Sequence, residues 1–224
     1  MQAQYAAGFD VEAMLDPDAH PWSTGSADDV KLIGTPAGLQ PTAAIRNAYT
    51  GKQIGAVQGV KVAAIHNGTE LAFRLEWDDA TENDEVGDTT AFPDAAAVVL
   101  PSVPNAPVMT MGAPKQAVNA WYWRADEKEG RGRQVVAEGL GTSRTVDREQ
   151  VRTRGNWKQG RWQVVIARPL RVQSTEPIAQ LQPGEITGFG VAIWEGSVGE
   201  RAGIKAFSGN WIELALDGMS TARR

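Results

Sequence analysis

The sequence predicts an all-β protein, an antiparallel β-sandwich with few short helices, from three observations. Short runs of apolar and β-branched residues recur along the chain, separated by Gly, Pro, Asn and Asp residues that favour turns. Leu71, Phe73, Leu75 and Trp77 alternate with small or polar residues, which is the period of a strand with one buried face. No stretch has the apolar spacing of a long amphipathic helix. Many short strands without long helices are typical of a sandwich.

Length and composition set the domain count and exclude several kinds of site. The 224 residues, 42% of them hydrophobic, suffice for one domain over residues 1–224. The net charge of −5 comes from interspersed acidic and basic residues, so neither nucleic acid nor a membrane surface is an expected partner. No apolar run approaches the roughly 20 residues that span a bilayer. Cysteine is absent, which excludes disulfides, thiolate metal sites, iron–sulfur clusters and covalently attached c-type haem.

The expected elements run in order from an irregular lead-in at residues 1–29. Strands are expected at 30–34, in a hairpin within 58–79, and at 95–101, 118–125, 162–170, 185–196 and 210–217. Asn67-Gly68 at the hairpin centre is the favoured pair for a type I′ turn. Residues 78–88 form an acidic loop, in which Asp78 and Asp79 are expected to be solvated. Residues 126–133 and 138–149 are expected to be polar connections.

The sequence offers little for independent catalysis. It contains no G-x-S-x-G elbow and no phosphate-binding loop. Its two histidines are His20 in the lead-in and His66 at the hairpin turn, and neither place is rigid enough for a general base. We therefore expect a protein that is not an enzyme on its own.

Two features have both a structural and a ligand-binding interpretation. Met109 and Met111 lie in the segment VMTMGAP (108–114) among prolines, where a packing residue has little core to fill. Lys205 is an isolated lysine among apolar and glycine residues. The methionines are either ordinary packing residues or soft metal ligands. The lysine either extends to water or binds a metal as a buried, neutral amine.

Trp121 and Trp123 share one face of an expected strand. They are core residues, a sugar-stacking platform, or the wall of a flat apolar cofactor pocket. The second interpretation gives the alternative function, a carbohydrate-binding β-sandwich module without haem. It predicts that Trp121 or Trp123 is exposed, that Met111 is ordinary packing, and that the protein is colourless.

Six segments, in order over about residues 55–217, resemble the haem-binding γ subunits of periplasmic molybdenum enzymes. That family includes ethylbenzene dehydrogenase, dimethylsulfide dehydrogenase, selenate reductase and chlorate reductase. The segments are FRLEWDD (73–79), FPDAAAVVLP (92–101), MGAP (111–114), VNAWYWRAD (118–126), GRWQVVIARPL (160–170) and ERAGIKAFSGNW (200–211).

The resemblance implies one b-type haem between the sheets, with a methionine and a lysine as axial ligands. The family's methionine precedes a glycine and corresponds to Met111 rather than Met109. Its lysine follows an R-x-G-x motif and corresponds to Lys205. The residues fit this implication, because a chain without cysteine can hold haem only non-covalently. The further candidates are Trp121, Tyr122, Trp123 and Phe207 for the pocket lining, and Arg124, Arg168 and Lys115 for the haem propionates.

The resemblance also implies a periplasmic electron-transfer subunit, although no signal peptide is visible in this chain. Its partners would be the iron–sulfur β subunit and the molybdenum α subunit of a heterotrimer, with a soluble c-type cytochrome as electron carrier. General similarity favours an oxyanion reductase, of the chlorate or selenate type. Since both axial positions are filled by protein, substrate chemistry is expected in the molybdenum subunit.

Overall fold

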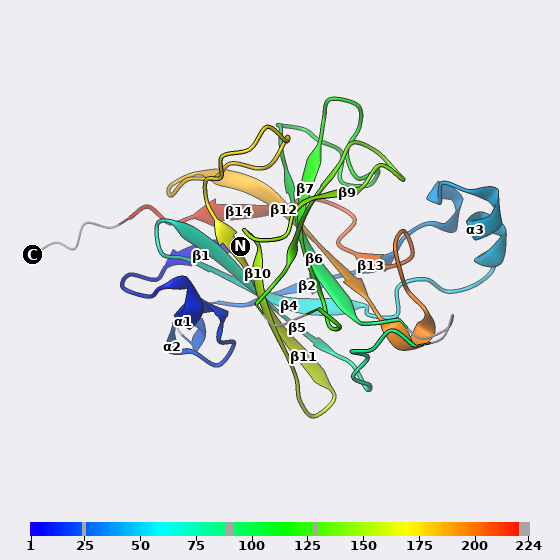
Figure 1. Ribbon diagram of the computed structural model, residues 1–224, viewed down its shortest axis with the longest axis horizontal. Helices are drawn as coiled ribbons and strands as arrows, with labels where there is room; N and C mark the ends of the chain where they lie inside the picture. Colours follow the sequence, from blue (N-terminus) through cyan, green and yellow to red (C-terminus); the bar gives the residue numbers. More distant parts are fainter. Residues whose placement is uncertain (24–25, 88–91, 128–129, 220–224) are drawn as a thin grey trace, which may run out of the picture.

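The fold is a two-layer β-sandwich (Figure 1), seen in a computed structural model that describes residues 1–23, 26–87, 92–127 and 130–219. The all-β prediction is confirmed. Residues 24–25 of the expected lead-in, residue 88 of the expected acidic loop and residues 128–129 of the first polar connection lie outside the described residues. Within the described part, none of the helices is long and apolar enough to cross a membrane.

The helices are few and short, as expected. They are α1 (Val11–Leu15), α2 (His20–Ser23), α3 (Ala43–Ala48) and the 3₁₀ turns η1 (Ala37–Leu39) and η2 (Gly196–Val198). The strands are β1 (Gln2–Tyr5), β2 (Asp28–Lys31), β3 (Ile33–Gly34), β4 (Gly59–His66), β5 (Glu70–Asp78), β6 (Ala95–Pro101), β7 (Val118–Arg124), β8 (Arg133–Ala137), β9 (Arg144–Asp147), β10 (Arg152–Trp157), β11 (Arg161–Pro169), β12 (Ile186–Trp194), β13 (Ala206–Phe207) and β14 (Ile212–Leu216).

The strands form one continuous sheet that folds over itself at β12. The path is β10-β11-β5-β4-β1-β14-β12-β6-β7-β8-β9, with β2 on β4 and with β13 between β12 and β3. Residues 186–189 of β12 pair with β14, and residues 190–194 pair with β6. The strands from β10 to β14 on this path make the first layer, and those from β6 to β9, with β13 and β3, make the second. β12 belongs to both layers.

The space between the layers is filled by side chains from both of them. Phe73 of the first layer lies edge-on to Trp121 of the second, with ring centroids 5.9 Å apart. Trp123 packs in the same manner against Trp162, at 4.9 Å. Rings in this arrangement add to the free energy of burying their apolar surface. The interlayer core therefore accounts for the alternating residues on which the fold prediction rests.

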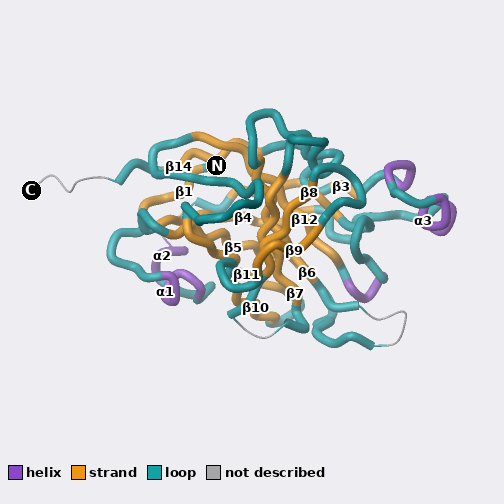
Figure 2. The backbone as a smooth tube through the Cα atoms, turned by 45° about the horizontal axis from the view of Figure 1, so that its top comes forward, coloured by secondary structure: helices purple, strands orange, loops and turns teal. Residues whose placement is uncertain are grey.

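The outer face of the first layer is also covered. Met14 and Leu15 of α1 and Trp22 of α2 pack on Ile65 and Ala72, which explains why these strands read as nearly continuous apolar runs. Figure 2 shows α1 and α2 together on this side, with α3 at the far end of the molecule.

Three local predictions were wrong. The lead-in contains β1, which pairs in parallel with both β4 and β14 although its sequence, QAQY, shows little strand pattern. His66 is the last residue of β4 and is fully buried, and burial lowers its pKa. The hairpin turn centres on Gly68-Thr69, because Asn67 N–H donates to the Glu70 carbonyl (3.1 Å). Only Gly68 of that pair has a positive φ (96°), so the turn is not type I′.

Candidate functional site

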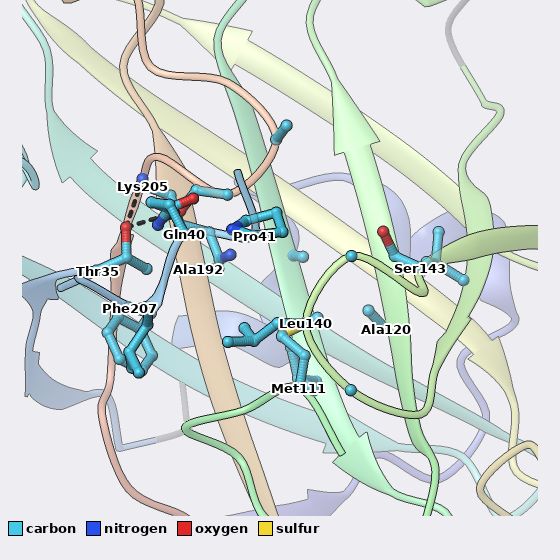
Figure 3. Close-up of a pocket in the computed structure, with 18 of the residues that line it drawn as sticks. Thr35, Gln40, Pro41, Met111, Ala120, Leu140, Ser143, Ala192, Lys205 and Phe207 are labelled. Atoms are coloured by element: carbon cyan, nitrogen blue, oxygen red, sulfur yellow. Dashed lines mark hydrogen bonds between the residues drawn. The ribbon is translucent and has the colours of Figure 1, made fainter. Parts of the chain in front are cut away.

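The outer face of the second layer holds a cavity of about 400 Å³ (Figure 3). Its floor is made by outward-facing residues of β6, β7, β8 and β12. Its walls come from the segments 35–45, 108–111 and 139–145 and from the approach to β13. The lining is mostly apolar and comprises Thr35, Pro36, Leu39, Gln40, Pro41, Ile45, Ala97, Val99, Val108, Met109, Met111, Ala120, Tyr122, Arg133, Val135, Gly139, Leu140, Gly141, Ser143, Arg144, Thr145, Ala192, Trp194, Ala202, Gly203, Lys205 and Phe207.

The alternation of β6 separates this cavity from the core. Ala97 and Val99 line the cavity, whereas Ala96 and Val98 face the interlayer core. Such a division follows from the period of two in a strand. A cofactor in this cavity would lie on the outside of one sheet and not between the two sheets, where the sequence analysis placed it.

Met111 reaches the cavity from a loop that its own hydrogen bonds hold. Met111 N–H donates to the Val108 carbonyl (3.0 Å), and Gly139 N–H donates to the Met111 carbonyl (2.9 Å). The backbone of Met111 has φ = 55°, a left-handed conformation that a non-glycine residue rarely adopts and that costs free energy. The loop thus fixes the direction of this side chain. Met109 also lines the cavity and is 38% exposed.

Lys205 lies at another part of the same lining, just before β13. Its backbone is bonded to Thr35, whose N–H donates to the Lys205 carbonyl (2.9 Å). The side chain is only 6% exposed, and its Nζ lies 5.4 Å from the centroid of the Trp194 ring. Burial lowers the pKa of Lys205 to about 8, against the smaller raising effect of Glu200. No described carboxylate forms an ion pair with this amine.

Figure 3 shows Lys205 and Met111 well apart in the lining, with Ala192 between them in that view. Tyr122 and Phe207 line the cavity too, so four of the candidates meet in one place. A thioether, an amine and aromatic side chains converge on a mostly apolar space, which is the kind of lining expected for a planar cofactor.

Two arginines of the cavity were not among the residues predicted from the sequence. Arg133 of β8 and Arg144 of β9 line the cavity, and the buried Nε of Arg133 has no hydrogen-bond partner. Arg133 also lies over the Tyr122 ring at 5.7 Å. Neither β8 nor β9 was expected as a strand, so these two side chains could not be assigned to a strand face from the sequence.

Five candidates lie elsewhere, four of them as follows. Trp121 and Trp123 are 0% and 5% exposed in the interlayer core, because they occupy the face of β7 opposite Ala120 and Tyr122. The Nη2 of Arg124 donates to Asp126 (2.7 Å), outside the cavity lining. Lys115 is likewise outside the lining.

Arg168 is fully buried in the interlayer core and does not line the cavity. Its guanidinium donates to Asn119 Oδ1 (3.0 Å), Gln134 Oε1 (3.1 Å) and the carbonyl oxygen of Ala179 (2.7 Å). It also lies over the Trp121 ring at 4.7 Å. Burial lowers the pKa of Arg168 to about 10. Its position two residues after Ile166 puts it on the core-facing side of β11.

Solved structures share the fold at low sequence identity. A family 9 carbohydrate-binding module of Caldicellulosiruptor kristjanssonii in complex with glucose superposes with a TM-score of 0.55 and 10% identity, over 99% of this chain and 97% of that one. The module in complex with cellotriose gives a TM-score of 0.51 and 11% identity, over 100% and 97% of the two chains. At such identities the likeness extends to the fold alone.

Sequence comparisons identify the family. The chain is 40% identical to chlorate reductase subunit gamma of Ideonella dechloratans over 71% of its own length, and it covers 65% of that protein, less than two thirds. It is 30% identical, over 92% of its length, to a Haloferax mediterranei protein assigned as the heme subunit of a respiratory nitrate reductase; that alignment covers 72% of the relative. Dimethylsulfide dehydrogenase subunit gamma of Rhodovulum sulfidophilum is 26% identical over 92% of this chain and 76% of that one. The profile of the ethylbenzene dehydrogenase family matches residues 22–145 and 131–206, and the chain is therefore a member of that family.

Proposed function

We propose that this chain is the haem-binding γ subunit of a molybdenum oxidoreductase complex and that it is not catalytic itself. The haem would be of the b type, and Met111 and Lys205 would be its axial ligands. The observation that supports this most directly is the presence of both side chains in the lining of one mostly apolar cavity. Each lies in a segment that resembles a family motif, and both line the same cavity although they are 94 positions apart in the sequence.

The residues of the cavity fit a haem. A chain without cysteine can hold haem only without covalent attachment, and neither His20 nor His66 lines the cavity. The thioether of Met111 and the amine of Lys205 are then the suitable iron ligands in the lining. Arg133, whose Nε has no hydrogen-bond partner, and the exposed Arg144 would provide positive charge for two propionates, although they form ion pairs with Glu127 and Glu176.

Each side chain has a definable task. Lys205 must lose its proton before its nitrogen binds iron, and burial favours that neutral form. The Met111 loop holds the thioether in one direction, and a thioether ligand raises the reduction potential of iron. The apolar lining keeps water from the metal. When bound, the haem would supply one-electron oxidation and reduction.

The relatives support a place for this chain in a multi-subunit enzyme. Subunits named gamma belong to multi-subunit enzymes, and the similarity to chlorate reductase subunit gamma favours an oxyanion reductase. We assign this chain to the periplasm, beside an iron–sulfur β subunit and a molybdenum α subunit. Its role would be to pass single electrons between the iron–sulfur subunit and a soluble c-type cytochrome.

The absorption spectrum of the purified protein, oxidised and reduced, tests this proposal. We expect a low-spin spectrum, a pigment that acid-acetone extracts completely, and loss of the low-spin bands in Met111→Ala and Lys205→Ala. Met109→Ala, on the same loop, is the matched control and should keep the spectrum. An unchanged spectrum in Lys205→Ala would contradict the ligand assignment.

The carbohydrate-binding alternative is weakened by the structure. It requires an exposed Trp121 or Trp123, and both are buried in the core. A colourless protein that does not take up added haemin, but binds glucose or cellotriose, would restore this alternative.

A further inference from the structure

Three acidic side chains meet where β5 ends, β6 begins and β12 ends. Asp79 directly follows β5, Asp94 directly precedes β6, and Glu195 directly follows β12. Their exposed fractions are 5%, 0% and 8%, and an oxygen atom of each lies within 4.8 Å of the others. Asp79 was expected in a solvated turn, so its burial is a correction. None of the three lines the haem cavity.

Hydrogen bonds orient two of these carboxylates. Asp94 accepts from the N–H groups of Gly196 (2.8 Å) and Asn83 (2.9 Å) and from Nε1 of Trp162 (3.0 Å). Glu195 accepts from the N–H (2.9 Å) and the hydroxyl (2.8 Å) of Ser197. Donors of this kind fix the direction of a carboxylate, as outer partners do for metal ligands.

Asp79 supplies an independent observation. Its Oδ1 accepts from Thr81 N–H (3.1 Å). Its Oδ2 is buried and makes no well-formed hydrogen bond, although the indole N–H of Trp77 is close enough to lower the pKa of Asp79. An acceptor that is poorly satisfied in this way costs free energy. Even with Trp77 nearby, Oδ2 keeps a lone pair that a cation can coordinate.

Among the described residues, no basic side chain pairs with the carboxylates of the cluster. No described lysine or arginine forms an ion pair with Asp79, Asp94 or Glu195. Burial and the neighbouring Asp94 raise the pKa of Asp79 to about 7. Burial raises the pKa of Asp94 as well. Carboxylates this close raise one another's pKa, and a cation between them would favour the ionised form of all three.

We propose that Asp79, Asp94 and Glu195 form a binding site for a divalent, oxygen-preferring cation, namely Ca²⁺. The donors are all carboxylate oxygens, and no sulfur or imidazole is present to favour Zn²⁺ or Cu²⁺. Ca²⁺ tolerates irregular carboxylate arrangements, whereas Mg²⁺ demands an octahedral set and keeps its waters. The cation would connect the end of β5 in the first layer with β6 and β12 in the second.

Calcium titration of the full chain, first treated with EDTA, tests the site. We expect one Ca²⁺ per chain by elemental analysis after dialysis. We also expect a rise of about 5–10 °C in the thermal midpoint at about a hundredfold excess of Ca²⁺ over its dissociation constant. Asp79→Asn should weaken calcium binding at least about tenfold. Asp84→Asn removes the same charge from an exposed position in the same segment and should leave binding unchanged.

The same experiments can also contradict the calcium site. If the cluster is neutralised by protons, wild-type protein will bind no Ca²⁺ at about 1 mM, and Asp79→Asn will be more stable than wild type at pH 8. That pair of results would overturn the proposal. Should Asp79→Asn fail to fold, the calcium titration of the wild-type chain decides alone. Its outcome is independent of haem content, so it does not depend on the proposed electron-transfer function.

Discussion

Lys205 is the residue at which stability and the proposed ligation oppose each other. Without a metal, its ammonium group is buried beside Trp194 and pairs with no described carboxylate, which disfavours the charged form in the folded state. The same burial makes it easier to remove the proton that would have to leave before the nitrogen could bind iron. Folding therefore contributes part of the cost of ligand deprotonation in advance.

Replacing Lys205 with methionine should stabilise the haem-free protein at neutral pH while abolishing lysine ligation. The folded pKa of about 8 is below the ordinary 10.5, so the wild-type penalty is full below pH 8 and disappears as pH rises towards 10.5. We expect a gain on the order of 2–3 kcal/mol at pH 7 that shrinks over this range. Thermal unfolding at pH 6–10.5 measures it. Exposed Lys31→Met is the control, and a gain independent of pH would refute the explanation.

Residue roles could be predicted from the sequence only where a motif or the strand period applied. Met111 and Lys205 were named from motifs, and both line one cavity. Arg168 was expected at the propionates, yet the period of two already places it on the same side of β11 as Ile166. Its burial depends on three hydrogen-bond acceptors, namely Asn119 of β7, Gln134 of β8 and the carbonyl oxygen of Ala179. No local sequence pattern reveals that these acceptors lie beside Arg168.

At the scale of elements, the cavity depends on loops that lie over a regular sheet. Strands with a clear period, such as β5, β7 and β11, were predictable. β1 was not, because it has few apolar residues and is held by two parallel neighbours far away in sequence. β8 and β9 were also not recognised, and with them the two cavity arginines. Long-range pairing decides such segments, and a single sequence carries little of that information.

The substitution Gly112→Ala should disturb the Met111 loop without disturbing the rest of the fold. Gly112 has φ = 85°, and a Cβ there would lie 2.7 Å from the carbonyl oxygens of both Ala137 and Gln116. We expect the loop to shift and haem affinity to fall about tenfold or more, as measured by haemin titration. Gly184→Ala is the matched control, since its φ is 83° and a Cβ there meets nothing within 4 Å. It should cost about 1 kcal/mol in urea unfolding and no haem affinity. Equal haem affinities in the two variants would contradict a positioning role for the loop.

At the scale of the whole molecule, the core and the cavity occupy opposite faces of the second layer. No residue of the interlayer core cluster lines the cavity. Opposite faces of β6, β7 and β12 thus serve two independent purposes. The sequence predicted the sandwich from its core face, but placing the cavity requires knowing which loops cover the other face.

Haem removal should loosen the protein without unfolding it. We expect the haem-free protein to unfold cooperatively at a lower thermal midpoint than the haem-loaded protein, because ligand binding stabilises only the folded state. Calorimetry of both forms measures the difference, and far-ultraviolet circular dichroism should show the same strand content. Identical midpoints would contradict haem binding in the folded protein.

This separation of faces also bears on the maturation of the protein. A cofactor enclosed between two sheets would have to be present while they close, and folding would then wait for its delivery. Here the sandwich can close on its own tryptophans and phenylalanines, while the cavity proposed for haem still faces outward beneath a few loops. Haem could then be inserted late, as a separate step, into a protein that has already folded. The supply of haem would limit how many subunits are active and not how many are folded.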